Sequence, residues 1–264
     1  MSIQKKSIQK KSIQKKSIQK KSVQKNRRYR RLFWLLPLLG IGVVLLQPKW
    51  FFALAVRVKP GALYAVELPK SAPKVVALTI DDGPSEDTAE ILEVLERYGA
   101  RVTFFHISGN VEEFESAIAQ TVQSGHELGN HLTADEPSIR LSETDFEADL
   151  LEAEAALLPY VEEKNLRWLR PGMGWYSAKM VKIAERHGYQ LALGSVFPYD
   201  THLPSAEFAS AFILNRVSSG DVIVLHDGEG RSERTIQTLK KILPALAEKG
   251  YQVTTLSKLV ELSQ

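Results

Sequence analysis

From residue 74 onward, the chain alternates short runs of β-branched and aromatic residues with amphipathic stretches of helical period. The first pattern is typical of buried strands, and the second is typical of helices that cover them. The predicted strands span 75–80, 102–106, 126–130, 167–169, 190–194, 221–225 and 252–256. The predicted helices include 86–99, 142–161, 177–188 and 231–250. Seven such strand–helix units predict a parallel sheet, because parallel strands need a crossover connection.

Glycine follows three of the predicted helices at the position where each is expected to end. Gly99, Gly188 and Gly250 occupy these positions, and glycine is common there because it adopts a left-handed conformation without steric cost. Two architectures remain open at this point, a doubly wound sheet and a closed or nearly closed (β/α) barrel. In both of them, functional sites form at the carboxyl ends of the strands.

Polar side chains stand at six consecutive ends of the predicted strands. In strand order they are Asp81 with Asp82, His106, His131, Arg170, Ser195 with Asp200, and His226. In a barrel these ends converge on one mouth, so we expect the side chains to lie together there. A lone histidine after a strand is more often structural than catalytic, and the whole series therefore indicates a site more strongly than any single member.

Two adjacent carboxylates in TIDDGP open the series. Asp81 and Asp82 are neighbours that point in different directions, so one can bind a cation while the other accepts a proton. The alternative is an acidic turn that caps the next helix. Arg170, in RPGMG, has the fork geometry to orient a carboxylate. His226 is suited to acid–base chemistry near neutral pH.

The stretch GHELGNHLTAD places Asp135 four residues after His131. Metal sites often use two histidines at this spacing, because residues four apart share one face of a helical turn. With a carboxylate as the second partner, three interpretations stay open: a metal site with an exchanged ligand, an impaired enzyme, or a polar loop. His126, at the start of the same stretch, is interpreted as structural.

In this order, these residues resemble the polysaccharide deacetylase family, carbohydrate esterase family 4, whose shared unit is the NodB homology domain. Five family motifs carry the resemblance. TFDDGP appears here as TIDDGP at 79–84, ATFF as VTFF at 102–105, GHEIGNH as GHELGNH at 125–131, the Arg-Pro motif as RPGMG at 170–174, and LxH as VLH at 224–226. The resemblance covers residues 74–262 and implies a distorted (β/α) barrel of about seven parallel units.

The resemblance implies metal-dependent removal of acetyl groups, mainly N-acetyl, from a polysaccharide or oligosaccharide such as a chitin-like glycan or peptidoglycan. It implies that Asp82 and His131 hold a divalent cation, which polarises the acetyl carbonyl and acidifies a water molecule. Relatives carry a second histidine at the position of Asp135. The resemblance implies zinc as the usual ion. A carboxylate at position 135 shifts the preference toward harder ions, so manganese, cobalt or magnesium are alternatives.

The resemblance also implies the catalytic roles. Asp81 is expected to act as general base on the attacking water, Arg170 to orient Asp81, and His226 to protonate the leaving amine. The backbone N–H near Met173 is expected to stabilise the oxyanion. Leu225 and neighbouring apolar side chains are expected to hold the acetyl methyl group.

Two segments depart from the family pattern. The Arg-Pro motif has Gly172 and Met173 where relatives have a second proline and an aromatic residue, which predicts a different substrate wall. Asp200 is expected to set the charge of His226, although its surroundings, VFPYDTHLPS, match poorly a further family motif that falls between the Arg-Pro and LxH motifs. The alternatives to an active deacetylase are a catalytically silent glycan-binding domain and a metal hydrolase of another non-peptide C–N amide. Five polar groups kept in register favour activity.

Charge separates the N-terminus from this domain. Residues 1–31 contain 13 Lys and Arg and no acid, which leaves 21 basic and 31 acidic side chains for the remainder. Within this segment SIQKK occurs four times over 2–21, and a variant copy, SVQKN, follows at 22–26. This five-residue period predicts a disordered tail rather than a helix. The tail either contacts anionic lipid or only sets membrane topology; we do not expect a nucleic-acid partner.

The next segment is apolar. Residues 32–46 carry no charge, and as a helix they would span about 22 Å of a roughly 30 Å bilayer core. We therefore predict a signal-anchor helix over 32–57, a linker over 58–73 and an extracytoplasmic catalytic domain over 74–264, with the basic terminus in the cytoplasm. The alternative is secretion after cleavage near Ala55. The absence of cysteine excludes disulfides, a thiolate nucleophile and Cys-ligated zinc.

Overall fold

The structure, a computed structural model, describes residues 60–162, 165–228 and 230–264, with isolated positions between 48 and 58. The predicted basic tail and most of the predicted membrane helix lie outside the described residues, so both stay predictions. In the described part of the chain, no helix is both long and apolar enough to cross a membrane. The chain divides into two units, Met1–Phe51 and Phe52–Gln264, and every element named below lies in the second.

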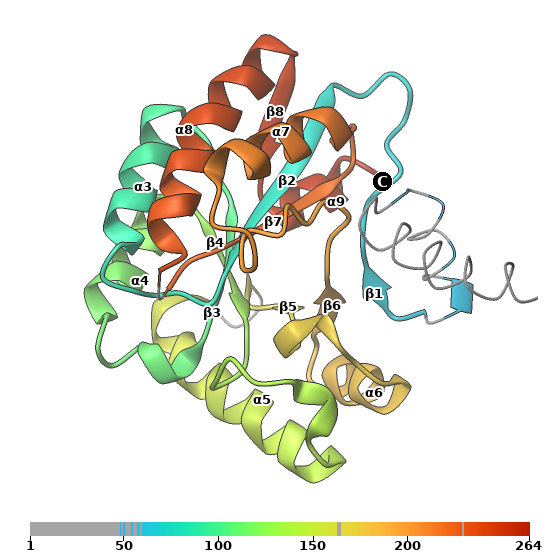
Figure 1. The fold of residues 1–264 in the computed structure, drawn as a ribbon. Helices are drawn as coiled ribbons and strands as arrows, with labels where there is room; N and C mark the ends of the chain where they lie inside the picture. Colours follow the sequence, from blue (N-terminus) through green and yellow to red (C-terminus); the bar gives the residue numbers. More distant parts are fainter. Residues whose placement is uncertain are drawn as a thin grey trace, which may run out of the picture. The chain divides into compact units, whose positions relative to one another are not determined.

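Eight parallel strands form a single sheet in the domain (Figure 1). They are β1 (Ala62–Leu63), β2 (Lys74–Asp81), β3 (Thr103–His106), β4 (Glu127–Asn130), β5 (Trp168–Leu169), β6 (Gln190–Ala192), β7 (Val222–His226) and β8 (Tyr251–Thr254). Their order is β1-β6-β5-β4-β3-β2-β7, and β8 pairs with the first half of β2. All seven predicted strands are confirmed.

The two edges of the sheet are joined by short bridges, which makes the sheet a nearly closed barrel. Val196, just after β6, forms a parallel bridge to Ile223 of β7, and Ala65 forms an antiparallel bridge to Asp221. The predicted barrel is thereby confirmed, and the doubly wound alternative does not apply. The predicted linker 58–73 is corrected in part, because β1 lies within it and pairs with β6.

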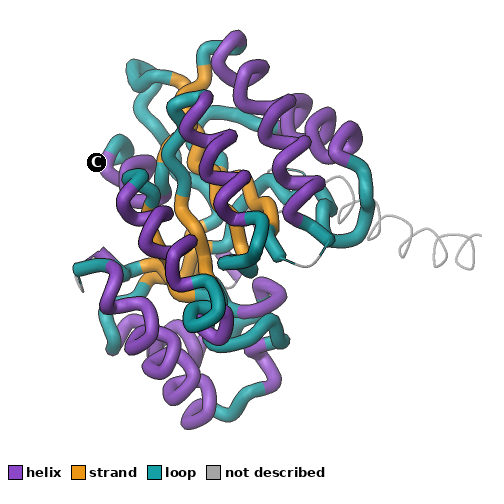
Figure 2. The backbone as a smooth tube through the Cα atoms, turned by 90° about the vertical axis from the view of Figure 1, so that its left-hand side faces the viewer, coloured by secondary structure: helices purple, strands orange, loops and turns teal. Residues whose placement is uncertain are grey.

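Helices surround the strands (Figure 2). The α-helices are α3 (Thr88–Arg97), α4 (Glu115–Gln123), α5 (Glu143–Leu157), α6 (Ala178–Arg186), α7 (Ala206–Arg216), α8 (Ser232–Glu248) and α9 (Leu256–Glu261). Single 3-10 turns are η1 (Ser108–Asn110), η2 (Ser138–Arg140), η3 (Leu158–Tyr160) and η5 (Gly172–Gly174). The predicted helices correspond to α3, α5, α6 and α8. Gly99, Gly188 and Gly250 each have positive φ, as predicted for helix ends.

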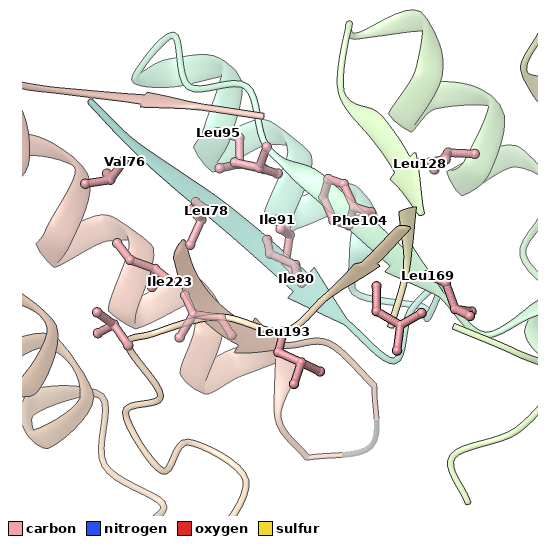
Figure 3. Close-up of a cluster of buried hydrophobic side chains, with 14 of the residues drawn as sticks. Val76, Leu78, Ile80, Ile91, Leu95, Phe104, Leu128, Leu169, Leu193 and Ile223 are labelled. Atoms are coloured by element: carbon pink, nitrogen blue, oxygen red, sulfur yellow. The ribbon is translucent and has the colours of Figure 1, made fainter. Parts of the chain in front are cut away.

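Alternation along β2 separates two cores. Val76, Leu78 and Ile80 point toward the helices and join the large buried cluster shown in Figure 3. Val75 and Ala77 point the other way, into a smaller cluster that fills the barrel interior, where Phe105, Trp168 and residues of α9 also pack. Because successive side chains alternate, Thr79 and Asp81 continue the interior row. The last residue of β2 therefore presents its carboxylate inside the barrel, at its mouth.

Candidate active site

Strand register brings the predicted polar residues together at the mouth. Asp81 at the end of β2 is paired with His226 at the end of β7. On the other side, Asn130 at the end of β4 is paired with Leu169 of β5, so His131 and Arg170 both follow that pair. The sheet itself, through its backbone hydrogen bonds, determines which side chains become neighbours.

Arg170 orients Asp81 from inside the barrel. Its Nη1 donates to Oδ1 of Asp81 at 2.5 Å and to Oγ1 of Thr79 at 2.8 Å. Its Nε and Nη2 donate to the carbonyls of Ala192 and Leu193, and its guanidinium lies 4.1 Å from the ring centre of Phe105. Both charged side chains are almost fully buried. With its donors committed in this way, the guanidinium is fixed, and it holds Asp81 in one orientation. The predicted contact is present.

His131 contacts Asp82 in the arrangement expected of two metal ligands. Its Nδ1 lies 2.6 Å from the carbonyl oxygen of Arg170, which can only accept, so Nδ1 carries the proton. Its Nε2 faces Oδ1 of Asp82 at 3.2 Å. A backbone carbonyl that fixes one ring nitrogen while the other faces a carboxylate is a common arrangement around protein-bound metal ions. These two residues therefore fit a divalent cation.

Charge around Asp82 stabilises its ionised form. Burial alone would raise its pKa, but the hydrogen bond from His131 and the positive charges of His131, His226 and Arg231 lower it to about 2. Burial lowers the pKa of His131, and the opposing effect of Asp82 and Asp81 is larger, so that pKa is raised. A proton on Nε2 of His131 thus occupies the place that a metal ion would take.

Asp135 is separated from this pair by an arginine that the sequence interpretation did not assign. Nη1 of Arg231 lies 2.7 Å from Oδ2 of Asp82, and its Nη2 lies 3.6 Å from Oδ2 of Asp135. Among the residues that the structure describes, no three His, Cys, Asp or Glu side chains are grouped closely enough to hold a metal. Two of the three predicted ligands are therefore in contact, and the ligand role of Asp135 stays a prediction.

His226 is held by Asp200. Both the backbone N–H of His226 and its Nδ1 contact Oδ2 of Asp200, at 2.9 and 3.0 Å. Burial lowers the pKa of His226, but the charge and hydrogen bond of Asp200, with smaller contributions from Asp81 and Asp82, raise it to about 9. The imidazole is therefore protonated at neutral pH, with Nε2 left as its second donor. The contact between Asp200 and His226 is present despite the poor motif match.

Replacing Asp200 with Asn is expected to move the alkaline limb of the activity profile to lower pH. The raised pKa of His226 favours its protonated form, so the associated stability is complete below pH 6.5 and is lost as pH rises through about 9. Without the Asp200 charge, His226 loses its proton nearer pH 6.5. The measurement is kcat/KM against pH, together with the histidine titration by NMR. An unchanged alkaline limb would remove Asp200 from this role.

The predicted role of Met173 stays a prediction, whereas that of Leu225 conflicts with the structure. Met173 is 61% exposed in the turn after Arg170, with φ at 58°. Leu225 is fully buried in the cluster between sheet and helices, together with Ile223. The prediction that Leu225 holds the acetyl methyl group is corrected, because strand alternation places Val224, two residues before His226, on the face of the catalytic histidine.

Four described residues other than glycine have left-handed backbone conformations, and each lies in or beside the site. They are Asp82, Leu132, Met173 and Tyr199, with φ between 58° and 69°. Such conformations are uncommon for residues with a Cβ, and they concentrate at functional sites, where the surrounding structure compensates for their cost. Leu132 follows His131, and Tyr199 precedes Asp200. The strain therefore coincides with the turns that position the reactive groups.

Two other histidines are buried. His106 ends β3 and is fully buried, with no hydrogen-bond partner for either ring nitrogen among the described residues. A Cβ at Gly83 would come within 3 Å of His106 and Asp227, so glycine is required at that turn. His126 accepts a hydrogen bond from the backbone of Val102, and burial lowers its pKa to about 4. The prediction of a structural His126 fits this position.

Sequence reasoning missed three residues at the mouth. Arg231 contacts Asp82, as described above. Asp227 accepts hydrogen bonds from Ser85, Thr88 and Ser232, which ties the DDGP turn to the start of α8. Trp175 follows the Arg-Pro segment and is 64% exposed. A tryptophan directly after RPGMG is visible in the sequence, whereas Asp227 and Arg231 resemble ordinary polar residues of a loop.

The barrel mouth thus combines an oriented carboxylate, a carboxylate–imidazole pair that fits a cation and a protonated histidine, an arrangement suited to metal-assisted hydrolysis. The family model described as polysaccharide deacetylase matches residues 69–192. The chain belongs to this family of hydrolases, which removes acetyl groups from glycans and depends on a divalent metal ion.

Relatives cover most of the domain. The chain is 32% identical to a peptidoglycan-N-acetylglucosamine deacetylase of Bacillus cereus over 207 residues, which are 77% of this chain and 96% of that protein. It is 30% identical to a chitooligosaccharide deacetylase of Sinorhizobium fredii, over 73% of this chain and 96% of that protein. A crystal structure of a peptidoglycan N-acetylglucosamine deacetylase superposes with a TM-score of 0.71 at 25% identity, covering 78% and 94% of the two chains.

Proposed function

We propose that this chain removes the N-acetyl group from N-acetylglucosamine units of peptidoglycan. The observation that carries the proposal is the pairing of a fixed carboxylate, Asp81, with a protonated histidine, His226, on adjacent strands. The Bacillus cereus relative, named for that activity, supports the choice of glycan. The Sinorhizobium fredii relative makes chitooligosaccharides the second candidate substrate.

Each reactive group has one atom available for the proposed reaction. Oδ1 of Asp81 is engaged by Arg170, so Oδ2 accepts the proton of the attacking water. Nδ1 of His226 is engaged by Asp200, so Nε2 donates a proton to the leaving nitrogen. Water adds to the acetyl carbon, the C–N bond breaks, and the products are acetate and a free amino sugar. The base and the acid thus serve opposite ends of the same bond.

A divalent cation would be held by Asp82 and His131, with Asp135 as the proposed third ligand. When bound, it would polarise the acetyl carbonyl and make a water molecule more acidic. We propose zinc as the ion, because imidazole and carboxylate both suit it, with manganese, cobalt or magnesium as alternatives. Trp175 is proposed to stack on a sugar ring, since an exposed indole offers an apolar face with a polar edge.

The experiment that tests this function measures released acetate and freed amine on purified peptidoglycan and on chitooligosaccharides. The protein is assayed as purified, after chelation, and after return of each candidate metal, with metal content measured in parallel. We expect chelation to abolish acetate release and one metal to restore it, because the cation provides the carbonyl polarisation.

The alternatives give different results in the same assay. A catalytically silent glycan-binding domain would bind these glycans but release no acetate, whichever metal is returned. A hydrolase of another amide would release acetate from neither glycan, while still retaining a metal. Release from chitooligosaccharides alone would keep the deacetylase but move its substrate away from peptidoglycan.

We also propose that the domain acts outside the cytoplasm, anchored through residues 32–57. The basic leader followed by an apolar stretch supports this placement, and peptidoglycan lies there. Protease added to intact protoplasts should degrade the domain; full protection of the domain would contradict the placement.

A further inference from the structure

Arg231 occupies the charge position that a metal ion would take. It lies immediately before α8, and its guanidinium reaches both Asp82, at 2.7 Å, and Asp135, at 3.6 Å. The two oxygens of Asp82 therefore each face a cationic partner, Oδ1 toward His131 and Oδ2 toward Arg231. Asp82 is only 5% exposed, so its charge depends on these partners rather than on water.

The guanidinium and a metal ion compete for the same oxygens. A divalent ion coordinates carboxylate oxygens at about 2.0–2.2 Å, which requires its ligands to converge on one point. Arg231 instead stands between Asp82 and Asp135 and connects them through two different nitrogens. For Asp135 to join Asp82 and His131 around one ion, the guanidinium has to leave that space.

Arg231 has part of its side chain in solvent. Gly228 and Gly230, in the turn just before it, both have positive φ, a conformation that glycine adopts at no steric cost. The Arg231 side chain is 23% exposed, whereas Arg170, which holds Asp81, is 3% exposed and donates to backbone carbonyls of β6 and the residue after it. One arginine is fixed in the interior, and the other lies at the rim.

We propose that Arg231 is an internal counter-ion that closes the cation site in the metal-free protein and is displaced when a divalent ion binds. This inference rests on the proposed metal-dependent function. Arg231 neutralises Asp82 before the metal arrives, and it lowers the metal affinity by the free energy needed to break its two ion pairs. Arg231 thereby competes with the metal ion for the carboxylate of Asp82.

The test compares the full-length wild type with Arg231→Gln, which keeps length and polarity but removes the charge. Both are stripped by chelation and titrated calorimetrically with Zn²⁺ and with Mn²⁺. We expect Arg231→Gln to bind metal about tenfold tighter, the factor that corresponds to roughly one charge-assisted hydrogen bond. Metal-free Arg231→Gln is also expected to melt at a lower temperature than metal-free wild type, with a larger stabilisation by metal.

Two matched variants control for general effects. Arg231→Lys keeps the positive charge and is expected to bind metal close to the wild-type affinity. Arg234→Gln removes a charge from the same helix at a position that contacts Gly230 rather than a carboxylate, and it is expected to match the wild type. Equal shifts in Arg234→Gln and Arg231→Gln would overturn the proposal by showing a non-local charge effect.

The remaining outcomes separate this inference from the proposed function. Metal binding that is equal or weaker in Arg231→Gln would overturn the counter-ion role and leave the deacetylase proposal intact. Metal bound by Arg231→Gln but not by wild type would support the counter-ion role and remove the metal role from the natural chain. Binding by neither protein would overturn both.

Discussion

Asp81→Asn is expected to lower acetate release by about 10²- to 10⁴-fold, the range contributed by a positioned general base. Asn keeps the shape of the side chain and can still contact Arg170, but it cannot accept a proton from water. Because Asp81 is not a proposed ligand, metal content should stay at the wild-type level. The measurement is kcat for acetate release at saturating glycan, with metal analysis of the same samples.

The matched control for Asp81→Asn is Asp145→Asn, an exposed carboxylate at the start of α5. It makes the same chemical change at an exposed position whose carboxylate accepts a hydrogen bond from Ser142, and it should leave kcat unchanged. If Asp81→Asn retains more than a tenth of the wild-type rate with its metal bound, Asp81 is not the base. A loss of metal together with rate would instead assign Asp81 to cation binding.

Arg170→Met is expected to destabilise the folded protein by about 3–5 kcal/mol, the typical cost of removing one partner from a buried ion pair. Asp81 is left charged inside the barrel, and the carbonyls of Ala192 and Leu193 lose their donors. Methionine has a similar length and fills the space without a charge. The measurement is the free energy of unfolding from urea denaturation at neutral pH, on metal-free protein.

A double variant shows which part of this loss comes from the buried charge. Combining Arg170→Met with Asp81→Asn removes the unpaired carboxylate, so we expect the double variant to be more stable than Arg170→Met alone. Recovery should be partial, because the two carbonyls after β6 remain without their donors. A double variant that is less stable than either single variant would contradict the ion-pair account.

The barrel and most of its mouth were predictable because local pattern and function coincide there. The apolar sequence of strands such as β2 predicts buried β-structure, and the polar residues directly after these strands mark their carboxyl ends. Helices α4, α7 and α9 were not among the stretches named from the sequence. The sequence of α7, AEFASAFILNR, is apolar around much of its circumference and shows little helical periodicity. Strand β1 was missed because two residues are too short for any pattern.

The errors at the site have a common physical origin. The family resemblance implied that Leu225 contacts the substrate, whereas alternation along β7 sends Leu225 and His226 to opposite faces. Arg231 gave no local signal, since an arginine in the loop before a helix usually faces solvent. Its contact with Asp82 joins residues 149 positions apart and exists only once β2 and α8 are packed.

The pairing of Asp81 with His226 places the proton acceptor and the proton donor on strands joined by backbone hydrogen bonds. Their separation is therefore governed by the inter-strand spacing of about 4.8 Å, a constant of sheet geometry. The segment that carries Trp175 can change its composition without altering that spacing. The sheet therefore fixes the distance between the two groups that transfer protons. Substitutions in the surrounding loops can change which glycan is recognised without changing that distance.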